Sequence, residues 1–246
     1  MRLLIINPNT TAAMTDKIRQ AGEAFLPRDW LITAVSGRFG PRYIASRATF
    51  AVASHAAIDA FAAHAAGHEC VLLACFGDPG LDALREASAV PVIGLVEASA
   101  IEASAMGRRF SIVTGGALWE PMLRESLQMR GLAGPLASIR TVAPDGGMIA
   151  RDPEAAMRLL ADACTACITQ DGAEVVVLGG VGLIGLAHRI EPLVGAPVIC
   201  SVMAGFRAAI AAQPTRHKPR LSPPSPIQSI GLSQELDALL AASLSS

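Results

Sequence analysis

Val71-Leu-Leu-Ala-Cys75-Phe-Gly77-Asp78-Pro-Gly80 is a buried-strand pattern that stops abruptly at a cysteine. Its apolar residues are typical of a buried strand, and the glycines, aspartate and proline that follow prevent the strand from continuing. We therefore expect the thiol of Cys75 at the carboxyl end of a strand. In open α/β sheets, ligands bind at that edge because the loops leaving the strands form a crevice with free backbone N–H groups. Taken alone, Cys75 also fits a small buried apolar residue.

The pattern around Cys75 occurs a second time, 105 residues later, with Gly180 in the place of the cysteine. Two further pairs of segments recur in the same order at offsets of 106 and 107 residues. Nearly constant spacing predicts two α/β halves of like topology, the second beginning near Arg108, with the strand ends at Cys75 and Gly180 facing one another across a cleft. The alternative to a repeat is that the matched segments are similar only because buried strands of α/β proteins have similar apolar sequences. The matched segments are Val71–Gly77 with Val176–Gly182, Pro91–Gly94 with Pro197–Cys200, and Leu3–Asn7 with Phe110–Thr114.

The composition is that of a globular protein with a large core. The chain has 246 residues, of which 52% are apolar and 17% charged, so it can form two domains of about 110 residues each. We expect an N-terminal half over residues 1–107, a C-terminal half over 108–212, and a proline-rich connector with a terminal helix over 213–246. The formal net charge of −1, the 4% aromatic content and the lack of a basic stripe argue against a nucleic-acid partner.

No targeting, membrane, metal or cofactor motif stands out. The N-terminus leads directly into a strand and no apolar run reaches about 18 residues, so we expect a cytoplasmic protein without a membrane partner. Five cysteines, an odd number scattered through the chain, do not resemble a disulfide framework. Cys164-Thr-Ala-Cys167 has metal or redox spacing, but it lies in a helical pattern without a second pair and fits core packing better. No phosphate-binding loop of the GxxxxGK[ST] type is present, and we expect no cofactor.

Polar residues follow the first two predicted strands. Asn7-Pro8-Asn9-Thr10-Thr11 ends the first strand, and Asn9 and Thr10 offer amide, hydroxyl and helix-start N–H groups to a carbonyl or an anion. A plain capping turn explains the same residues. The second strand leads into Ser36–Tyr43, a polar loop that could act as a lid, in which Arg38 and Arg42 could grip a carboxylate. Simple solvation is the alternative for both arginines.

The second half supplies corresponding strand ends. Thr114 and Gly115 follow its first strand, and Gly179–Gly182 follows a later one. His188 comes soon after and could reach the cleft, although a helix-surface histidine is the alternative. Residues 213–229 hold five prolines and read as an extended connector, whereas Ser233–Leu244 can form a last helix that docks on the body or on a neighbour.

Four motifs in this order resemble the hydantoin racemase branch of the aspartate/glutamate racemase superfamily over about residues 1–210. They are Asn7–Thr11, Cys75–Gly80, Pro91–Gly94 and the Leu178–Gly179 strand end. The resemblance implies two pseudo-symmetric flavodoxin-like halves, each an open, mostly parallel sheet flanked by helices, with the active site in the cleft between them. It also implies cofactor-free chemistry at a carbon next to a carbonyl, a homo-oligomer, and two cysteines acting as acid and base on opposite substrate faces. The first falls on Cys75, and the second falls on Gly180, which has no thiol.

Proton removal next to a carbonyl needs a positioned base and donors aimed at the developing oxyanion. Cys75 is the predicted base, and the substrate is expected to be a small carbonyl or carboxylate compound such as a hydantoin or amino-acid derivative. The missing second thiol leaves three readings open: a racemase with another acid such as His188, a single-cysteine decarboxylase of the arylmalonate type, or a non-catalytic binding protein. The expected substrate-binding residues are Asn9, Thr10, Arg42, Phe76, Gly77, Thr114, Gly115, Val181 and Gly182.

Overall fold

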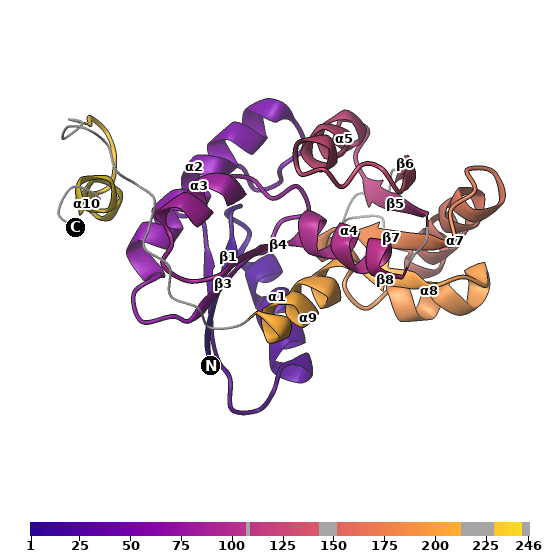
Figure 1. The fold of residues 1–246 in the computed structure, drawn as a ribbon, viewed down its shortest axis with the longest axis horizontal. Helices are drawn as coiled ribbons and strands as arrows, with labels where there is room; N and C mark the ends of the chain where they lie inside the picture. Colours follow the sequence, from indigo (N-terminus) through magenta and orange to yellow (C-terminus); the bar gives the residue numbers. More distant parts are fainter. Residues whose placement is uncertain (107–108, 143–151, 213–228, 243–246) are drawn as a thin grey trace. The chain divides into compact units, whose positions relative to one another are not determined.

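The computed structural model describes residues 1–106, 109–142, 152–212 and 229–242 (Figure 1). The chain divides into two compact units. Unit 1 holds residues 1–74 and 78–93 and the described residues from 208 onward, and unit 2 holds residues 75–77 and 94–207. The predicted boundary at 107 and 108 differs from this division because helix α4 (Leu95–Ala105) packs on the strands of the second sheet.

Unit 1 is built on a four-stranded sheet in the order β2-β1-β3-β4. Strand β1 pairs in parallel with β2 and β3, with Leu3 opposite both Ile32 and Cys70. Right-handed crossovers place α1 on one face of this sheet and α2 and α3 on the other, and the packing of α2 on both α3 and β1 agrees. The elements are β1 (Arg2–Asn7), α1 (Ala12–Phe25), β2 (Leu31–Ser36), α2 (Arg47–His64), β3 (Cys70–Leu73), α3 (Leu81–Ala87) and β4 (Val92–Gly94).

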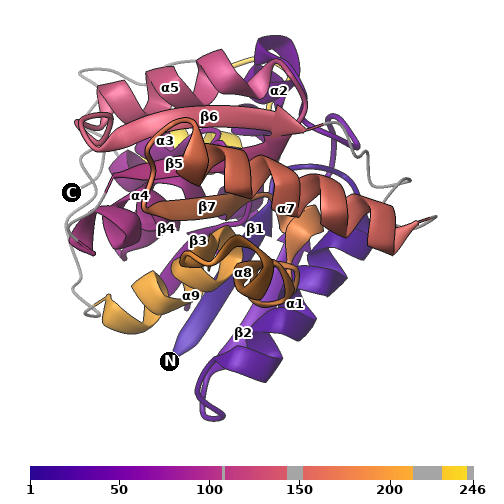
Figure 2. The ribbon, with the colours of Figure 1, turned by 90° about the vertical axis from the view of Figure 1, so that its right-hand side faces the viewer.

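Unit 2 repeats this topology with the strand order β6-β5-β7-β8. Strand β5 pairs in parallel with β6 and β7, and β7 with β8. Helices α7 and α8 pack on one another and on this sheet, and α4 packs on α5 (Figure 2). The further elements are β5 (Phe110–Gly115), α5 (Trp119–Met129), β6 (Leu136–Val142), α7 (Pro153–Thr169), β7 (Val175–Gly179), η1 (Val181–Leu183), α8 (Ala187–Val194), β8 (Val198–Cys200) and α9 (Ser201–Ala211).

The central strands explain why the sequence forms these sheets. Residues 3–6 of β1 and 175–178 of β7 are at most 1% exposed, as expected for strands covered by helices on both faces. The predicted pair of α/β halves of like topology is thereby confirmed: β1, β3 and β4 hold the same places in the first sheet as β5, β7 and β8 in the second.

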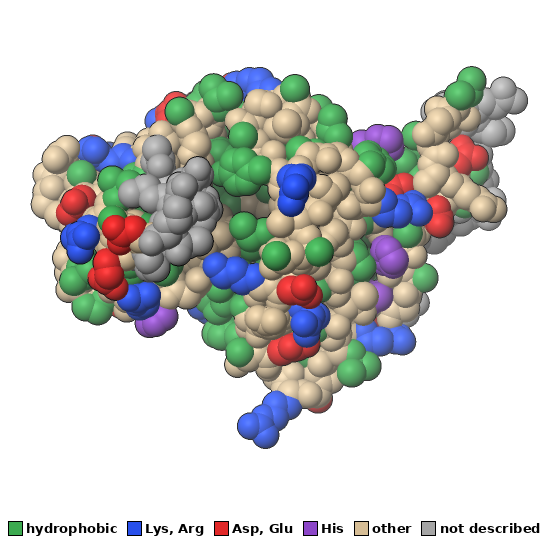
Figure 3. All heavy atoms as spheres, turned by 180° about the vertical axis from the view of Figure 1, so that it is seen from behind, with side chains coloured by type: hydrophobic (Ala, Val, Ile, Leu, Met, Phe, Trp, Pro, Cys, Tyr) green, Lys and Arg blue, Asp and Glu red, His purple; other side chains and the backbone are tan. Residues whose placement is uncertain are grey.

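The last described element, α10 (Gln234–Ala242), packs against α2. It corresponds to the helix predicted over Ser233–Leu244, whereas most of the predicted proline-rich connector, residues 213–228, lies outside the described residues. Within the described residues no helix combines the length and the apolarity needed to span a membrane. On the face drawn in Figure 3, acidic and basic side chains are interspersed.

Candidate active site

Cys75 lies at the carboxyl end of β3, as the sequence predicts. Strand pairing ends at Ala74, whose N–H donates to Ile6 O at 2.8 Å, and the chain then turns tightly, with the Gly77 N–H donating to Cys75 O at 2.9 Å. Asp78 follows with φ of 54°, a left-handed conformation that is uncommon for residues other than glycine, and it is only 3% exposed. A buried aspartate held in this conformation fixes the direction in which the chain leaves the cysteine.

Cys75 is also the most accessible cysteine of the chain. It is half-buried, whereas the other four are buried. Burial raises the pKa of Cys70 and of Cys164 to about 12, and burial likewise raises the pKa of Cys167. A thiol must form the thiolate to act as a base, so these three side chains are unsuited to that role. Cys164 and Cys167 are core residues of α7, as expected from their spacing.

The ring of Phe76 lies against the backbone of Gly179. A β-carbon at position 179 would stand 2.1 Å from Phe76 Cε1 and 2.4 Å from Phe76 Cδ1, which only glycine avoids. The Phe76 side chain is 5% exposed, so it is a packing residue and its ring is not free for a substrate. Because both residues belong to unit 2, this contact joins the residue after Cys75 to the residue before Gly180.

The end of β7 is fixed by two hydroxyl groups. Thr114 Oγ1, at the end of β5, donates to Gly179 O at 2.8 Å, and Gly180 N donates to Ser201 Oγ at 3.2 Å. Thr114 is 5% exposed and Ser201 is fully buried, so both hydroxyls position the strand end. Gly115 is the last residue of β5.

Position 180 is open on its side-chain side. Apart from its two chain neighbours, no described residue has an atom within 4 Å of the place that a β-carbon would take. Gly180 has φ of +129°, which L residues rarely adopt. The space is therefore available, but the present backbone conformation favours glycine.

The backbone donors at the two strand ends differ in availability. The Gly77 N–H, expected to bind substrate, donates to Cys75 O at 2.9 Å. Within the described part of the chain, the N–H groups of Phe76 and Val181 donate to no other residue, and they remain candidates for an oxyanion. Gly182 already takes part in an interaction.

Asn7 and Asn9 organise the end of β1. Asn9 Oδ1 accepts from Asn7 Nδ2 at 3.0 Å and from Thr11 N at 2.9 Å, while Asn7 Nδ2 also donates to Thr15 Oγ1 at 2.9 Å. The oxygen of Asn9 is thus committed, and its Nδ2 group, which no described residue binds, is left as a donor for a carbonyl. The Thr10 N–H donates to Pro41 O at 3.1 Å, and the Thr10 hydroxyl remains a candidate donor to a substrate.

Arg38 and Arg42 have different roles in the loop after β2. Arg38 makes a two-pronged ion pair with Asp59, Nε to Oδ2 at 2.8 Å and Nη2 to Oδ1 at 2.9 Å, so it is a structural residue. Arg42 is exposed, and within the described residues nothing pairs with its guanidinium. Its backbone O accepts from Thr11 Oγ1 at 2.7 Å, which ties the arginine to the end of β1. Arg42 therefore remains the candidate cation for a substrate.

His188 lies in the first turn of α8 with an exposed side chain. No described residue forms a hydrogen bond to its ring. The structure also shows no group of three or more His, Cys, Asp or Glu side chains able to hold a metal ion within the residues it describes.

Three residues of the site were not expected from the sequence: Asn7, Asp59 and Ser201. Asn7 was visible as the start of the Asn7–Thr11 motif, but its role depends on a bond to Thr15, one turn into α1. Ser201 directly follows β8, which neighbours β7 in the sheet, so knowing the strand order would have pointed to it. Asp59 gave no signal, since it lies mid-helix in an alanine-rich segment.

Comparisons with known proteins agree on one family. The family model for Asp/Glu/Hydantoin racemase matches residues 3–209. A hydantoin racemase of Pseudomonas sp. is 36% identical over 211 residues, which cover 85% of this chain and 84% of that protein. Among solved structures, allantoin racemase from Klebsiella pneumoniae has a TM-score of 0.84 at 29% identity and covers 96% of this chain and 98% of its own. Allantoin racemase from Pseudomonas fluorescens has a TM-score of 0.86 at 28% identity, and the match covers 94% of this chain and 100% of that protein.

Proposed function

The chain belongs to the Asp/Glu/hydantoin racemase family, and on that premise we propose that it is a cofactor-independent racemase of 5-substituted hydantoins, the class of cyclic ureides that includes allantoin. The observation that carries the proposal is the position of Cys75. It is the one partly exposed thiol of the chain and it lies at the carboxyl end of a central strand.

In the proposed reaction, the thiolate of Cys75 takes the proton from the hydantoin carbon next to the carbonyl. The C–H bond breaks, an S–H bond forms, and the electron pair moves onto the carbonyl oxygen as an enolate. The N–H groups of Phe76 and Val181 are the candidate donors for the oxygens of the ring. Return of a proton to the opposite face completes the inversion.

Position 180 cannot supply that proton, because glycine has no acidic side chain. His188 is the first titratable side chain after the strand end, and its exposed ring is free of bonds to described residues. We assign it the role of the second acid, a group that typically contributes about 10²–10⁴-fold to the rate.

A decarboxylase is the second candidate function, and the bare position 180 favours it. Loss of CO2 from a substituted malonate forms the enolate directly, so one thiol suffices to protonate it. The open space beside Gly180 would then face the departing carboxylate.

The loss of optical rotation separates these functions. Single enantiomers of 5-substituted hydantoins and of allantoin are incubated with the wild-type protein and with Cys75→Ala, while CO2 release is measured on a panel of substituted malonates. Racemisation that disappears in Cys75→Ala but persists in Cys200→Ala, which removes another strand-end thiol, supports the proposal. CO2 release without racemisation would replace it with the lyase, and binding without either reaction would leave a non-catalytic protein.

A further inference from the structure

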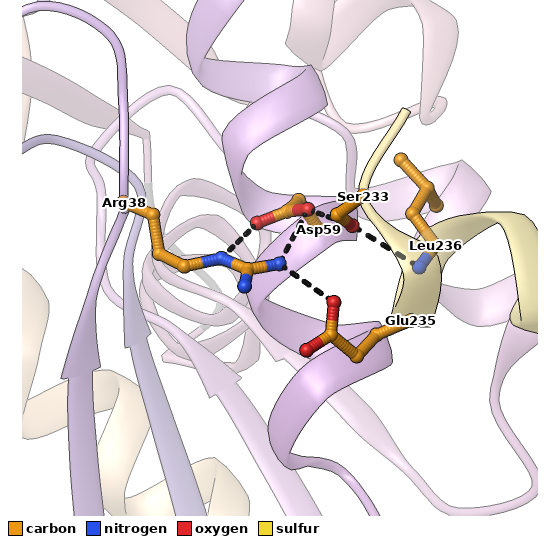
Figure 4. Close-up of polar contacts among 5 residues, drawn as sticks. All are labelled: Arg38, Asp59, Ser233, Glu235 and Leu236. Carbon is orange, nitrogen blue, oxygen red and sulfur yellow. Dashed lines mark hydrogen bonds and ion pairs between the residues drawn. The ribbon is translucent and has the colours of Figure 1, made fainter. Parts of the chain in front are cut away.

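Asp59 is a buried carboxylate on α2 whose two oxygens are both bonded (Figure 4). Arg38 binds both oxygens from the loop after β2. Ser233, just before α10, donates its hydroxyl to Oδ1 of the same carboxylate. Asp59 is 1% exposed, so one buried carboxylate joins three segments that are far apart in sequence.

The start of α10 is shaped for this contact. Ser233 Oγ also accepts the N–H of Leu236 at 3.2 Å, the capping bond that a helix start requires. Leu236 is 3% exposed, whereas Glu235 and Asp237 on either side are exposed. Glu235 adds a second, solvent-exposed contact by accepting from Arg38 Nη2 at 3.2 Å. The helix is thus held by a buried leucine and a polar contact to Asp59.

The loop that carries Arg38 is fastened at its other end to the end of β1. Gly37 N donates to Asn7 O at 2.8 Å and to Asn9 O at 3.1 Å, and Thr10 N donates to Pro41 O. Gly37 fits closely: a β-carbon there would lie 3.1 Å from Pro8 O and 3.2 Å from Ala56 Cβ. Residues 37–42 therefore bridge the β1 end to α2.

We infer that the C-terminal helix positions the substrate loop: Ser233, through Asp59 and Arg38, holds residues 37–42 in the place where Asn9, Thr10 and Arg42 bind the hydantoin. This inference rests on the proposed function for the identity of the ligand. Ser233 and Asp59 are positioning residues that act through Arg38 and do not touch the substrate. In this proposal α10 contributes to substrate binding by holding residues 37–42.

The charges favour one fixed arrangement. Arg38 beside Asp59, and to a lesser extent the Ser233 hydroxyl, hold the pKa of Asp59 below its usual range, so the carboxylate stays ionised. Removing the Ser233 hydroxyl would leave Oδ1 with one donor fewer in a buried place, where a hydrogen bond to a charged group is hardest to replace. The Asp59 carboxylate would then be held less firmly, and so would Arg38, which binds to it from the loop.

The test uses the full chain with Ser233→Ala, the conservative Ser233→Thr, and Gln234→Ala as the matched control, since Gln234 is an exposed neighbour on the same helix turn. Amide hydrogen exchange is followed at Gly37 and Thr10, whose N–H groups report loop docking. We expect Ser233→Ala to raise the exchange rates of these two amides and the KM for a hydantoin by about tenfold, the change expected for one lost hydrogen bond to a charged group, with kcat unchanged. Ser233→Thr restores both, and Gln234→Ala changes neither.

Unchanged exchange at Gly37 and Thr10 in Ser233→Ala would overturn the inference whatever the activity. A tenfold fall in kcat with an unaltered KM would also overturn the inference, because a residue that positions the binding loop should change KM and leave kcat unaltered. If Ser233→Ala speeds exchange but the wild-type protein racemises no hydantoin, the contact that holds residues 37–42 is supported and the proposed function is rejected. Failure of the inference and failure of the proposed function can therefore be told apart.

Discussion

The ring of Phe76 fills the space in which a side chain at Gly179 would begin, so the residue after the candidate base packs on the residue before Gly180. The contact fixes the backbone beside Cys75 against the end of β7, and this end is also bonded to the hydroxyls of Thr114 and Ser201. In the proposed chemistry this packing sets the place of the thiol.

Gly179→Ala is expected to destabilise the protein. The added methyl group would lie 2.1 Å from Phe76 Cε1, so the ring or the strand end must move, at a cost of about 1–3 kcal/mol. Urea denaturation measures this cost. Gly134→Ala is the control, since no described residue other than its chain neighbours comes within 4 Å of its β-carbon position. Equal stability of the two variants would contradict the packing described here.

Gly180→Cys tests whether position 180 faces the substrate. A side chain at φ of +129° is strained, so we expect a loss of about 1–3 kcal/mol in the free energy of unfolding, while a thiol facing the substrate raises racemisation by about 10²–10⁴-fold. Gly180→Ala carries the same strain without the thiol and should show the loss of stability alone. Identical rates in the two variants would mean that position 180 does not face the substrate.

His188→Gln is expected to slow racemisation by about 10²-fold or more if the ring donates the second proton. Stability should stay within about 0.5 kcal/mol, because the side chain is exposed and makes no bond to a described residue. The exposed His64 on α2 provides the control as His64→Gln. Full activity in His188→Gln would contradict the assignment of His188 as the second acid.

Asp59→Asn is expected to change how stability depends on pH. Arg38 first, then Ser233, lower the pKa of Asp59 in the folded state, so its stabilising effect is complete above the unfolded value of about 3.9 and is lost as the pH falls through the folded value. His55 and Glu235 also face this group, and Glu235 likewise has a lowered pKa. Unfolding free energies measured from pH 7 down to pH 2 should converge for wild type and variant at the acid end. Parallel curves would contradict the lowered pKa.

The fold could be predicted because its signal lies in repeated buried runs. The offset between Val71–Gly77 and Val176–Gly182 predicts the two sheets, and β3 and β7 occupy equivalent places in them. The unit boundary could not be predicted, since α4 follows the first sheet in sequence but packs on β5, β7 and β8. Periodicity describes one element at a time and does not say which sheet a helix will cover.

The site could be predicted only as a set of strand ends. Cys75 lies where the sequence places it, whereas the packing of the Phe76 ring on Gly179 and the bond from Gly77 N to Cys75 O were not expected. Phe76 and Gly179 are more than a hundred residues apart, so no local pattern reveals their contact. The same holds for Arg38 and Asp59, whose pairing leaves Arg42 as the candidate cation of the loop.

The most direct measurement is deuterium uptake at the ring carbon of a 5-substituted hydantoin in heavy water, comparing the wild-type protein with Cys75→Ala and Cys200→Ala. We predict uptake with wild type and with Cys200→Ala, and a loss of about 10²–10⁴-fold with Cys75→Ala. Uptake that persists at the wild-type rate in Cys75→Ala would contradict the assignment of this thiol as the base.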